Sequence, residues 1–288
     1  MTFRVSVVIP VYNAEPYLKN AVESAHNLEE VKEIVLVEDR SKDNSFQICQ
    51  ELVKTFSKVS LYTHPNHENL GAGASRNLGI ENSKEDYIAF LDADDWYLTN
   101  RFLKAKEIFS TNDSVDGVYG ATGFYDEATR EIDQSRLTTV RKKVDPENLL
   151  VTLLTSSAGR FHTNAITLRK RIFEESGLFD TSLRLHQDTH LWLRLAHVGK
   201  LLPGEVNTAV AIRRVHPLNR IQHLNKESRR LLFIKTFEWF VKQPSVDPAA
   251  FRIMFNRYTA ASADNVVKRF FFSAGYLLRT PSVIRKLI

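Results

Sequence analysis

The sequence of 288 residues predicts an α/β fold. We expect a Rossmann-like, mixed but mainly parallel sheet with helices on both faces, followed by a C-terminal helical extension. Short β-branched runs alternate with helix-like segments in the first part of the chain, which is typical of βαβ units. Residues that favour helix starts stand in front of these segments, and beyond about Leu224 the chain carries helical patterns.

The first half of the chain is expected to hold four strand–helix units. The strands are the runs VSVVIP, EIVLVED, VSLYTH and DYIAFLD, and the helices cover residues 16–26, 44–56, 71–80 and 101–109. Pro16 suits a first helical turn, and Asp43 or Asn44 can cap the second helix. These units predict a parallel sheet that is covered on both faces.

The pattern loosens after Val115. Aromatic strands are expected near GVYGATGFYDE, then a basic linker, RKKVDPEN, and then a strand–helix pair in TNAITLRKRIFEES. We therefore expect three parts. Residues 1–115 and 116–215 form the two halves of one α/β domain, and residues 216–288 form a basic helical C-terminal region.

Cysteine content and hydropathy indicate the cellular compartment in which the protein is found. Cys49 is the only cysteine, so the chain has no intramolecular disulfide and no thiolate cluster for a metal. The N-terminal apolar stretch is short and is soon interrupted, which favours a first strand over a signal peptide. No window has the roughly 18 to 20 consecutive apolar residues that span a bilayer. We expect a cytoplasmic protein.

Charge is distributed unevenly along the chain. From Arg213 to the end there are 15 Lys and Arg against 4 Asp and Glu, whereas the first 212 residues are net acidic. The tail NVVKRFFFSAGYLLRTPSVIRKLI interleaves aromatic and basic residues, which is typical of a segment lying on an anionic membrane surface, here the inner face. A helix packed on the rest of the protein is the alternative. Nucleic acid is a less favoured partner.

Polar residues follow three of the expected strands. In open parallel sheets, ligands bind outside the carboxyl ends of the strands. We expect one crevice to collect the residues at these ends, namely Pro10, Val11, Tyr12, Glu15, Asp39, Asp92, Ala93 and Asp94. An aromatic ring such as Tyr12 can stack on a base, and the carboxylate of Asp39 can accept hydrogen bonds from a base or ribose.

The segment FLDADD places three carboxylates directly behind a hydrophobic run. On an extended chain, Asp92 and Asp94 point the same way, which suits a divalent cation, Mg²⁺ or Mn²⁺, with oxygen ligands. Such an ion commonly arrives with substrate phosphates. His216 follows the last expected strand and is a further candidate ligand for this metal, with a surface-loop histidine as the alternative.

Two further segments carry candidate site residues. Arg76 in NLGAGASRNLGI stands near a helix start, where it approaches a phosphate or forms a structural ion pair. This segment lacks the glycine spacing of a dinucleotide site and the lysine of a P-loop, which argues against dehydrogenases and ATPases. Asp188 opens an amphipathic helix at the expected crevice, where a carboxylate can act as a general base or only cap the helix.

His186 and His190 in HQDTH have the spacing of a zinc-peptidase motif, but Gln187 stands where that motif needs a glutamate. Glutamine cannot act as the general base, so this interpretation is disfavoured. His162 is expected to be structural.

In its motifs the chain resembles family 2 glycosyltransferases of the GT-A fold. VSVVIPVYNAEPYL, IVLVEDRSKDNS, NLGAGASRNLGI, YIAFLDADD and GLFDTSLRLHQDTHLWLRLA follow the family's order and spacing over residues 3 to about 200. The resemblance implies that Tyr12 and Asp39 hold the nucleotide, that Asp92 and Asp94 form the metal and diphosphate motif, and that Asp188 is the base. It makes residues 1–115 the nucleotide-binding half and residues 116–215 the acceptor half.

The sequence departs from the family pattern at two positions. Glu38 stands where the family has its first Asp after the second strand, and Gln187 replaces the Glu that precedes the base. The second change removes a negative neighbour of Asp188, where the family has its acceptor contacts.

The resemblance also implies a reaction. An inverting, non-processive enzyme would move a single sugar from a nucleotide-diphosphate sugar, here a UDP-sugar, to a hydroxyl of a glycan or lipid-linked acceptor in cell-surface polysaccharide or glycan synthesis. The Gln-x-x-Arg-Trp motif of the family's processive polymerases is absent. The alternatives are a sugar-phosphate nucleotidyltransferase and a non-catalytic protein that binds nucleotides or nucleic acid.

Overall fold

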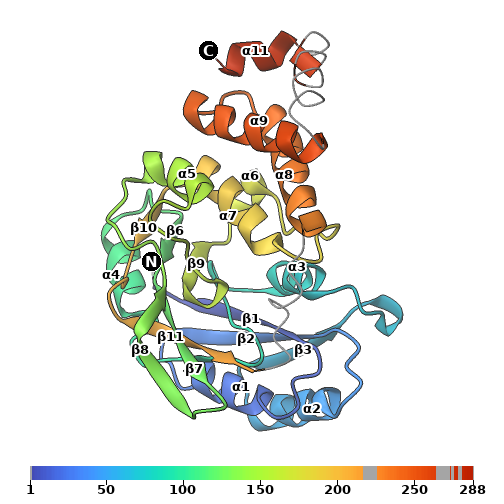
Figure 1. Cartoon of the computed structure of the whole chain (residues 1–288). Coiled ribbons are helices and arrows are strands. Elements are labelled where there is room, and N and C mark those ends of the chain that lie inside the picture. Colours follow the sequence, from blue (N-terminus) through green and yellow to red (C-terminus); the bar gives the residue numbers. More distant parts are fainter. Residues whose placement is uncertain (1, 217–225, 264–272, 274–275, 278–280, 288) are drawn as a thin grey trace.

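The computed structural model describes residues 2–216, 226–263, 273, 276–277 and 281–287 (Figure 1). Its centre is a seven-stranded sheet in the order β10-β6-β9-β4-β1-β2-β3. The strands are β1 (Val5–Val11), β2 (Val31–Glu38), β3 (Val59–Thr63), β4 (Tyr87–Phe90), β6 (Gly117–Tyr119), β9 (Ile166–Arg169) and β10 (Leu201–Pro203). β9 runs antiparallel to β4 and β6, and the other pairs are parallel. The predicted mixed, mainly parallel sheet is confirmed.

Helices cover both faces of this sheet, because successive side chains of a strand point to opposite sides. On β1, Val7 and Ile9 belong to one apolar core, whereas Val8 belongs to the other. The first core is covered by α1 (Leu18–His26), α2 (Ser45–Thr55) and α4 (Leu103–Thr111), and the second by α3 (Ala72–Asn82), α5 (Pro146–Thr155), α6 (Ile172–Ser176) and α7 (Gln187–Val198). Figure 1 shows α1 and α2 below the sheet and α3 and α7 above it.

A second sheet of four strands, in the order β5-β11-β7-β8, lies beside the first. Its members are β5 (Trp96–Tyr97), β7 (Ala121–Asp126), β8 (Glu131–Thr138) and β11 (Ala209–Val215). The sequence did not predict β8 or α5. β8 is an edge strand with mostly exposed side chains, so it lacks a buried apolar face. The expected basic linker ends at Asp145, the N-cap of α5.

In the part of the chain that the structure describes beyond the sheets, α8 (Lys226–Val241), α9 (Pro248–Ser262) and α11 (Pro281–Leu287) form the helical extension. α8 packs against α7, and α9 packs against α8, α5 and α11. Figure 1 shows them as a column that rises away from the sheet. Phe237, Phe240 and Phe251 are fully buried and belong to the second core, the one that contains Val8. Among the helices of the described ranges, none is both long and apolar enough to cross a bilayer.

Candidate active site

The carboxyl ends of β1, β2 and β4 meet at one edge of the sheet. Val11 pairs with Glu38, and the Asp39 backbone nitrogen donates to the Val11 carbonyl at 2.9 Å. On the other side of β1, the Leu91 nitrogen donates to the Val8 carbonyl. The structure therefore brings the segments after all three strands together. Chain order reverses here, since β2 lies on one side of β1 and β4 on the other.

Asp39 is buried at this edge and organises the segment that leads into α3. Its two carboxylate oxygens accept hydrogen bonds from the backbone nitrogens of Leu70, at 2.7 Å, and Gly71, at 2.9 Å. Gly71 has a φ of 89°, a conformation that glycine adopts without strain. Asp39 thus fixes the backbone in front of α3, and its contact with a nucleotide stays a prediction.

The segment after β1 is tied to the start of α2. The Glu15 carboxylate accepts from the backbone nitrogen of Asn44 at 3.0 Å and from its side-chain amide at 2.8 Å. Asn44 is the N-cap of α2, but Asp43 accepts the hydrogen bond from the Ser45 nitrogen. Glu15 therefore has a structural role, because it joins the segment after β1 to the start of α2.

Pro10 and Val11 are the last two residues of β1. Tyr12 follows them directly and is half-buried.

The acidic segment after β4 is a turn. The Asp95 nitrogen donates to the Asp92 carbonyl at 3.0 Å, with Ala93 and Asp94 between them. The expectation of an extended segment with two parallel carboxylates is wrong, because this turn directs the acids to different partners. The Asp94 carboxylate lies 3.0 Å from Nε2 of His216 and is 30% exposed. Thus the sequence-predicted pair of Asp94 and His216 is brought together.

Asp95 holds the turn from inside the protein. It is buried, and its two oxygens accept from the Asn164 side-chain amide at 2.6 Å and from the Arg214 backbone nitrogen at 2.8 Å. Burial raises the pKa of Asp95 well above its usual range, and the charges of Asp94 and Asp92 raise it further. Asp95 is therefore a structural acid. The roles of Asn164 and Arg214 could not be predicted, because both residues lie far from the turn in the sequence.

Asp92 is paired with Arg76, one of the two roles expected for that arginine. Nη2 of Arg76 donates to Oδ1 of Asp92 at 2.6 Å, and the guanidinium lies 5.5 Å from the centre of the Phe179 ring. Burial favours the neutral acid, but the positive charge of Arg76 outweighs it and lowers the pKa of Asp92. Asp92 is therefore ionised at neutral pH.

His162 also belongs to this site, although the sequence favoured a structural role. Ligand atoms of Asp92, Asp95 and His162 all lie within 4.8 Å of one another. Nδ1 of His162 accepts from the Asn164 nitrogen at 3.3 Å, in η2 (Thr163–Ala165). Burial lowers the pKa of His162 and keeps the ring neutral, the form that ligates a metal. A lone histidine outside any motif gave no signal of this placement.

The oxygen and nitrogen atoms of these acidic and histidine side chains are suitable ligands for a divalent cation. Carboxylate oxygens and a neutral imidazole suit Mn²⁺, and carboxylates alone suit Mg²⁺. Both oxygens of Asp95 already accept hydrogen bonds, whereas the carboxylates of Asp92 and Asp94 are 27% and 30% exposed. The side chains of Asp92 and Asp94 are therefore better placed than that of Asp95 to ligate a cation, and His216 lies beside Asp94.

Asp188 is the second residue of α7 and is half-buried. The N-cap position is held by His186, so Asp188 is not the cap. The negative charge of Asp188 raises the pKa of both His162 and His186 against the effect of their burial, which places it within electrostatic reach of the two rings. Gln187 packs against Gly73 at the start of α3. The start of α7 therefore lies against the start of α3, within electrostatic reach of His162.

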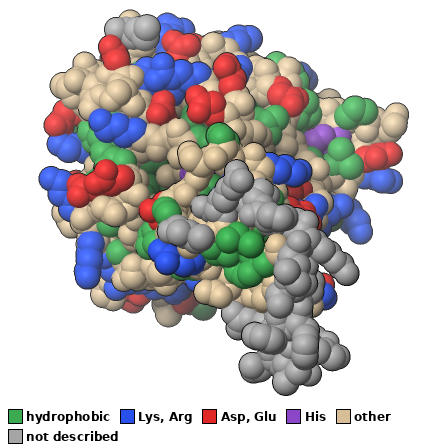
Figure 2. Space-filling model, turned by 90° about the horizontal axis from the view of Figure 1, so that it is seen from above, with side chains coloured by type: hydrophobic (Ala, Val, Ile, Leu, Met, Phe, Trp, Pro, Cys, Tyr) green, Lys and Arg blue, Asp and Glu red, His purple; other side chains and the backbone are tan. Residues whose placement is uncertain are grey.

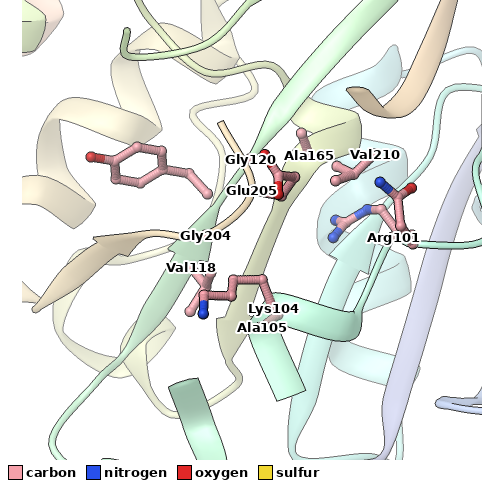
Figure 3. A pocket seen from close by; sticks show the side chains of 11 residues that line it. Arg101, Lys104, Ala105, Val118, Gly120, Ala165, Gly204, Glu205 and Val210 are labelled. Carbon is pink, nitrogen blue, oxygen red and sulfur yellow. The ribbon is translucent and has the colours of Figure 1, made fainter. Parts of the chain in front are cut away.

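A small pocket lies apart from these residues, between the start of α4 and strands β6, β10 and β11 (Figure 3). Arg101 lines it and is buried, donating to the carbonyls of Asn164 and Ile166 and to the hydroxyl of Thr167. None of the sequence-predicted site residues lines this pocket. Through these hydrogen bonds Arg101 holds the backbone of η2 and the start of β9 in place, which is a structural role.

The model of one family, described as Glycosyl transferase family 2, matches residues 6–176, more than half of the chain. A relative from Rickettsia felis, described as an uncharacterized glycosyltransferase, is 31% identical over 203 residues, which are 68% of this chain and 32% of the relative. A second, from Haemophilus influenzae, has the same description and is 35% identical over 147 residues, 51% of this chain and 56% of the relative. The chain thus matches about a third to just over half the length of these relatives.

Solved structures share the fold. TarS 1–349 of S. aureus in complex with UDP-GlcNAc gives a TM-score of 0.67 at 17% identity, covering 99% of this chain and 79% of that one. The mannosyltransferase PcManGT from Pyrobaculum calidifontis, in complex with GDP-Man and Mn²⁺, gives 0.60 at 15% identity, covering 98% and 83%. These likenesses confirm the fold class. The family match and the relative from Rickettsia felis settle the membership that the motifs indicated: the chain belongs to glycosyltransferase family 2.

Proposed function

We propose that this chain is an inverting glycosyltransferase that moves a single sugar from a nucleotide-diphosphate sugar, a UDP-sugar, to a hydroxyl of a glycan or lipid-linked acceptor. The observation that carries the proposal is the arrangement of acids at one edge of the sheet. Asp39, Asp92 and Asp94 follow the strand ends, and Asp188, in the first turn of α7, acts electrostatically on the same His162 ring as Asp92. The family match and the nucleotide sugars bound by TarS and PcManGT support it.

A divalent cation is part of the proposal. Asp94 and His216 would hold Mn²⁺ or Mg²⁺ beside Asp92, and a bound cation would neutralise the charge that develops on the departing nucleoside diphosphate. Arg76 keeps Asp92 ionised and in place. Mn²⁺ in the PcManGT complex supports this choice of cofactor.

The chain's own residues supply the remaining steps. Tyr12 stacks on the base, and Asp39 accepts its hydrogen bonds or those of the ribose. Asp188 takes the proton of the acceptor hydroxyl as that oxygen forms a bond to the anomeric carbon, and the bond from this carbon to the diphosphate oxygen breaks. A single displacement of this kind inverts the anomeric configuration.

The setting of the reaction is proposed on the same basis. We place it in cell-surface polysaccharide or glycan synthesis, in the cytoplasm at the inner face of the membrane. A lipid-linked acceptor would be met there in two dimensions.

Release of nucleoside diphosphate from a panel of UDP-, GDP- and dTDP-sugars tests the proposal. With Mn²⁺, one donor class should release diphosphate in the presence of a glycan or lipid-linked acceptor mixture, and the Asp188→Asn variant should bind the same donor without comparable release. Binding of no nucleotide sugar by the wild-type chain would reject the proposed function.

A further inference from the structure

Arg214, near the end of β11, is enclosed by aromatic rings. Its guanidinium carbon lies 4.7 Å from the centre of the Tyr17 ring, 5.0 Å from that of Trp96 and 5.3 Å from that of Tyr125. Only 15% of the Arg214 side chain is exposed. On the face shown in Figure 2, by contrast, Lys and Arg side chains lie at the surface among acidic ones. Three ring faces attract this cation at once, so they fix its position.

The rings around Arg214 come from three different elements. Tyr17 is the N-cap of α1, and Trp96 belongs to β5. Tyr125 lies on β7, directly opposite Arg214 in the sheet, and its ring packs edge to face on that of Trp96. The Tyr17 hydroxyl donates to the Glu127 carboxylate, which lies 3.9 Å from Nη1 of Arg214. We call these four side chains around the guanidinium the Arg214 cage.

Arg214 holds the acidic turn after β4 through two hydrogen bonds. Its Nε donates to the backbone carbonyl of Asp94 at 3.1 Å, and its backbone nitrogen donates to Oδ1 of Asp95 at 2.8 Å. The first of these bonds fixes the backbone of Asp94 and leaves the carboxylate of that residue to other partners. Arg214 therefore determines where the Asp94 side chain starts.

The cage also contacts His216, the residue that lies beside Asp94. The Tyr17 ring, which packs on the guanidinium, has its centre 5.3 Å from the centre of the His216 imidazole. Nε2 of His216 is 3.0 Å from the Asp94 carboxylate. Both members of this pair thus have a direct connection to the cage, Asp94 through a hydrogen bond and His216 through a ring contact.

We infer that Arg214 is a positioning residue for the divalent cation, and that the cage keeps its guanidinium in place. The inference rests on the proposed function, in which Asp94 and His216 hold that cation, and it names the residue that keeps the two together. Groups that orient metal ligands contribute to affinity, because the ligands then need no ordering when the ion binds. Arg214 acts through Asp94, since its Nε is bonded to the backbone of that residue.

The test measures the dissociation constant of Mn²⁺ by electron paramagnetic resonance of the free ion, on the full chain with equimolar UDP. Arg214→Gln should raise this constant by about tenfold. Arg136→Gln is the matched control and should not raise it. The Arg136 guanidinium also packs on a ring, that of Phe124 at 3.8 Å, but β8 is separated from β11 by β7. Arg252→Gln, at an exposed arginine of α9, is a second control.

Two further variants show how Arg214 acts. Asp94→Asn/Arg214→Gln should have the Mn²⁺ affinity of Asp94→Asn alone, because an arginine that acts through the Asp94 carboxylate has no effect once that ligand is lost. Trp96→Leu keeps the guanidinium and its hydrogen bonds but removes one ring of the cage. It should raise the dissociation constant by about threefold, and it tests the inference with Arg214 intact.

The outcomes separate the inference from the proposed function. Wild-type Mn²⁺ affinity in Arg214→Gln, or in Trp96→Leu where the former does not fold, overturns the inference and leaves the glycosyltransferase proposal standing, even if the variant unfolds at a lower temperature. Losses that add in the double variant assign Arg214 to the donor and also overturn the inference. A wild-type chain that binds UDP but no Mn²⁺ has no cation to position, which is a third contradiction. Failure of the wild-type chain to bind UDP rejects the proposed function, and with it the inference.

Discussion

Asp92, Asp94 and Asp95 stand close together in the sequence, yet the fold gives each a different environment. Arg76 holds Asp92 ionised, Asp94 is half-buried beside His216, and Asp95 is buried with a raised pKa. Like charges this close repel, and the protein reduces the repulsion by pairing one acid and favouring the neutral form of another. Asp94 is left as the acid best placed to meet a cation.

Replacing Asp188 by asparagine should leave donor binding nearly unchanged and lower turnover by about 10²-fold or more. The amide keeps the shape of the side chain but cannot take the acceptor proton. Calorimetry with UDP and Mn²⁺ measures binding, and diphosphate release measures turnover. If affinity for the donor falls as steeply as turnover, Asp188 is a binding residue and the proposed base is wrong.

Individual residues also show which parts of the candidate site could be predicted from the sequence and which could not. The strand-end acids and Asp188 could be found because strand ends and helix starts leave local patterns. His162, Asn164 and Arg214 could not, because they reach the site through contacts between segments far apart in the chain. The hydrogen bonds that Asp95 accepts from Asn164 and Arg214, for example, join residues 69 and 119 positions apart. The turn at Asp92–Asp95 was missed because it depends on those same contacts.

Among the elements, α3 lies very close to β1. A Cβ atom placed on Gly79 would come within 2.3 Å of Cγ1 of Val8, which is fully buried. Gly79→Ala should therefore destabilise the fold by about 1–3 kcal/mol, measured as the free energy of unfolding in urea, in spite of the higher helix propensity of alanine.

A double-mutant cycle isolates this contact. In a Val8→Ala background the added methyl group has room, so Gly79→Ala should cost much less there than in the wild type. Equal costs in the two backgrounds would show that the helix does not depend on this close approach.

His190 on α7 should make stability depend on pH. Burial and the nearby charge of Arg194 lower its pKa to about 4. The unfolded chain, with an ordinary histidine pKa of about 6.5, binds more protons between these values, so stability should fall as the pH falls from 6.5 toward 4. At pH 5 the loss from this residue is about 2 kcal/mol relative to pH 7.5.

His190→Gln should remove this part of the pH dependence, and His67→Asn, at an exposed histidine, should not. Urea unfolding of the three proteins at pH 7.5 and pH 5 measures it. The same loss of stability in the wild type and in His190→Gln would show that the buried histidine does not control the effect.

Sequence patterns predicted those elements that are buried on both sides. The first four strands and their helices carry long apolar runs and recurring helix starts, and the structure has all of them with shifts of a few residues at their ends. β8 has mostly exposed side chains, and α5 follows a basic stretch. For these reasons the sequence patterns predicted neither element. The first turn of α1 also begins later than Pro16, at Leu18.

At the scale of the whole molecule, the helical column is joined to the α/β part by α7–α8 and α5–α9 packing. Most of the tail that the sequence placed on a membrane, including residues 264–272, lies outside the described residues. Of those described, Tyr276 packs near Phe237, Val283 is buried, and Nζ of Lys286 donates to the Val241 carbonyl at 2.6 Å. These three residues support the alternative of a packed helix for their part of the tail.

Membrane binding by the remaining cations stays a prediction. The intact chain should co-sediment with anionic vesicles at low salt, and Lys268→Gln/Arg269→Gln should weaken binding by up to about 1 kcal/mol per residue, whereas Arg252→Gln should not. These substitutions are preferable to truncation after Asp264, which would also remove the buried Val283. Equal sedimentation of the double variant and the wild type would exclude these two cations as the anchor.

The central claim is that the crevice at the strand ends takes a nucleotide diphosphate together with a divalent cation held by Asp94. Calorimetric titration of UDP into the wild-type chain, with Mn²⁺ and with EDTA, tests it most directly. Asp94→Asn is the variant, and Glu175→Gln, at an exposed acid of α6, is the control. We predict that UDP binds in Mn²⁺, that EDTA or Asp94→Asn weakens binding by about tenfold or more, and that the control behaves like the wild type. UDP affinity that is unchanged by EDTA and by Asp94→Asn would contradict the account.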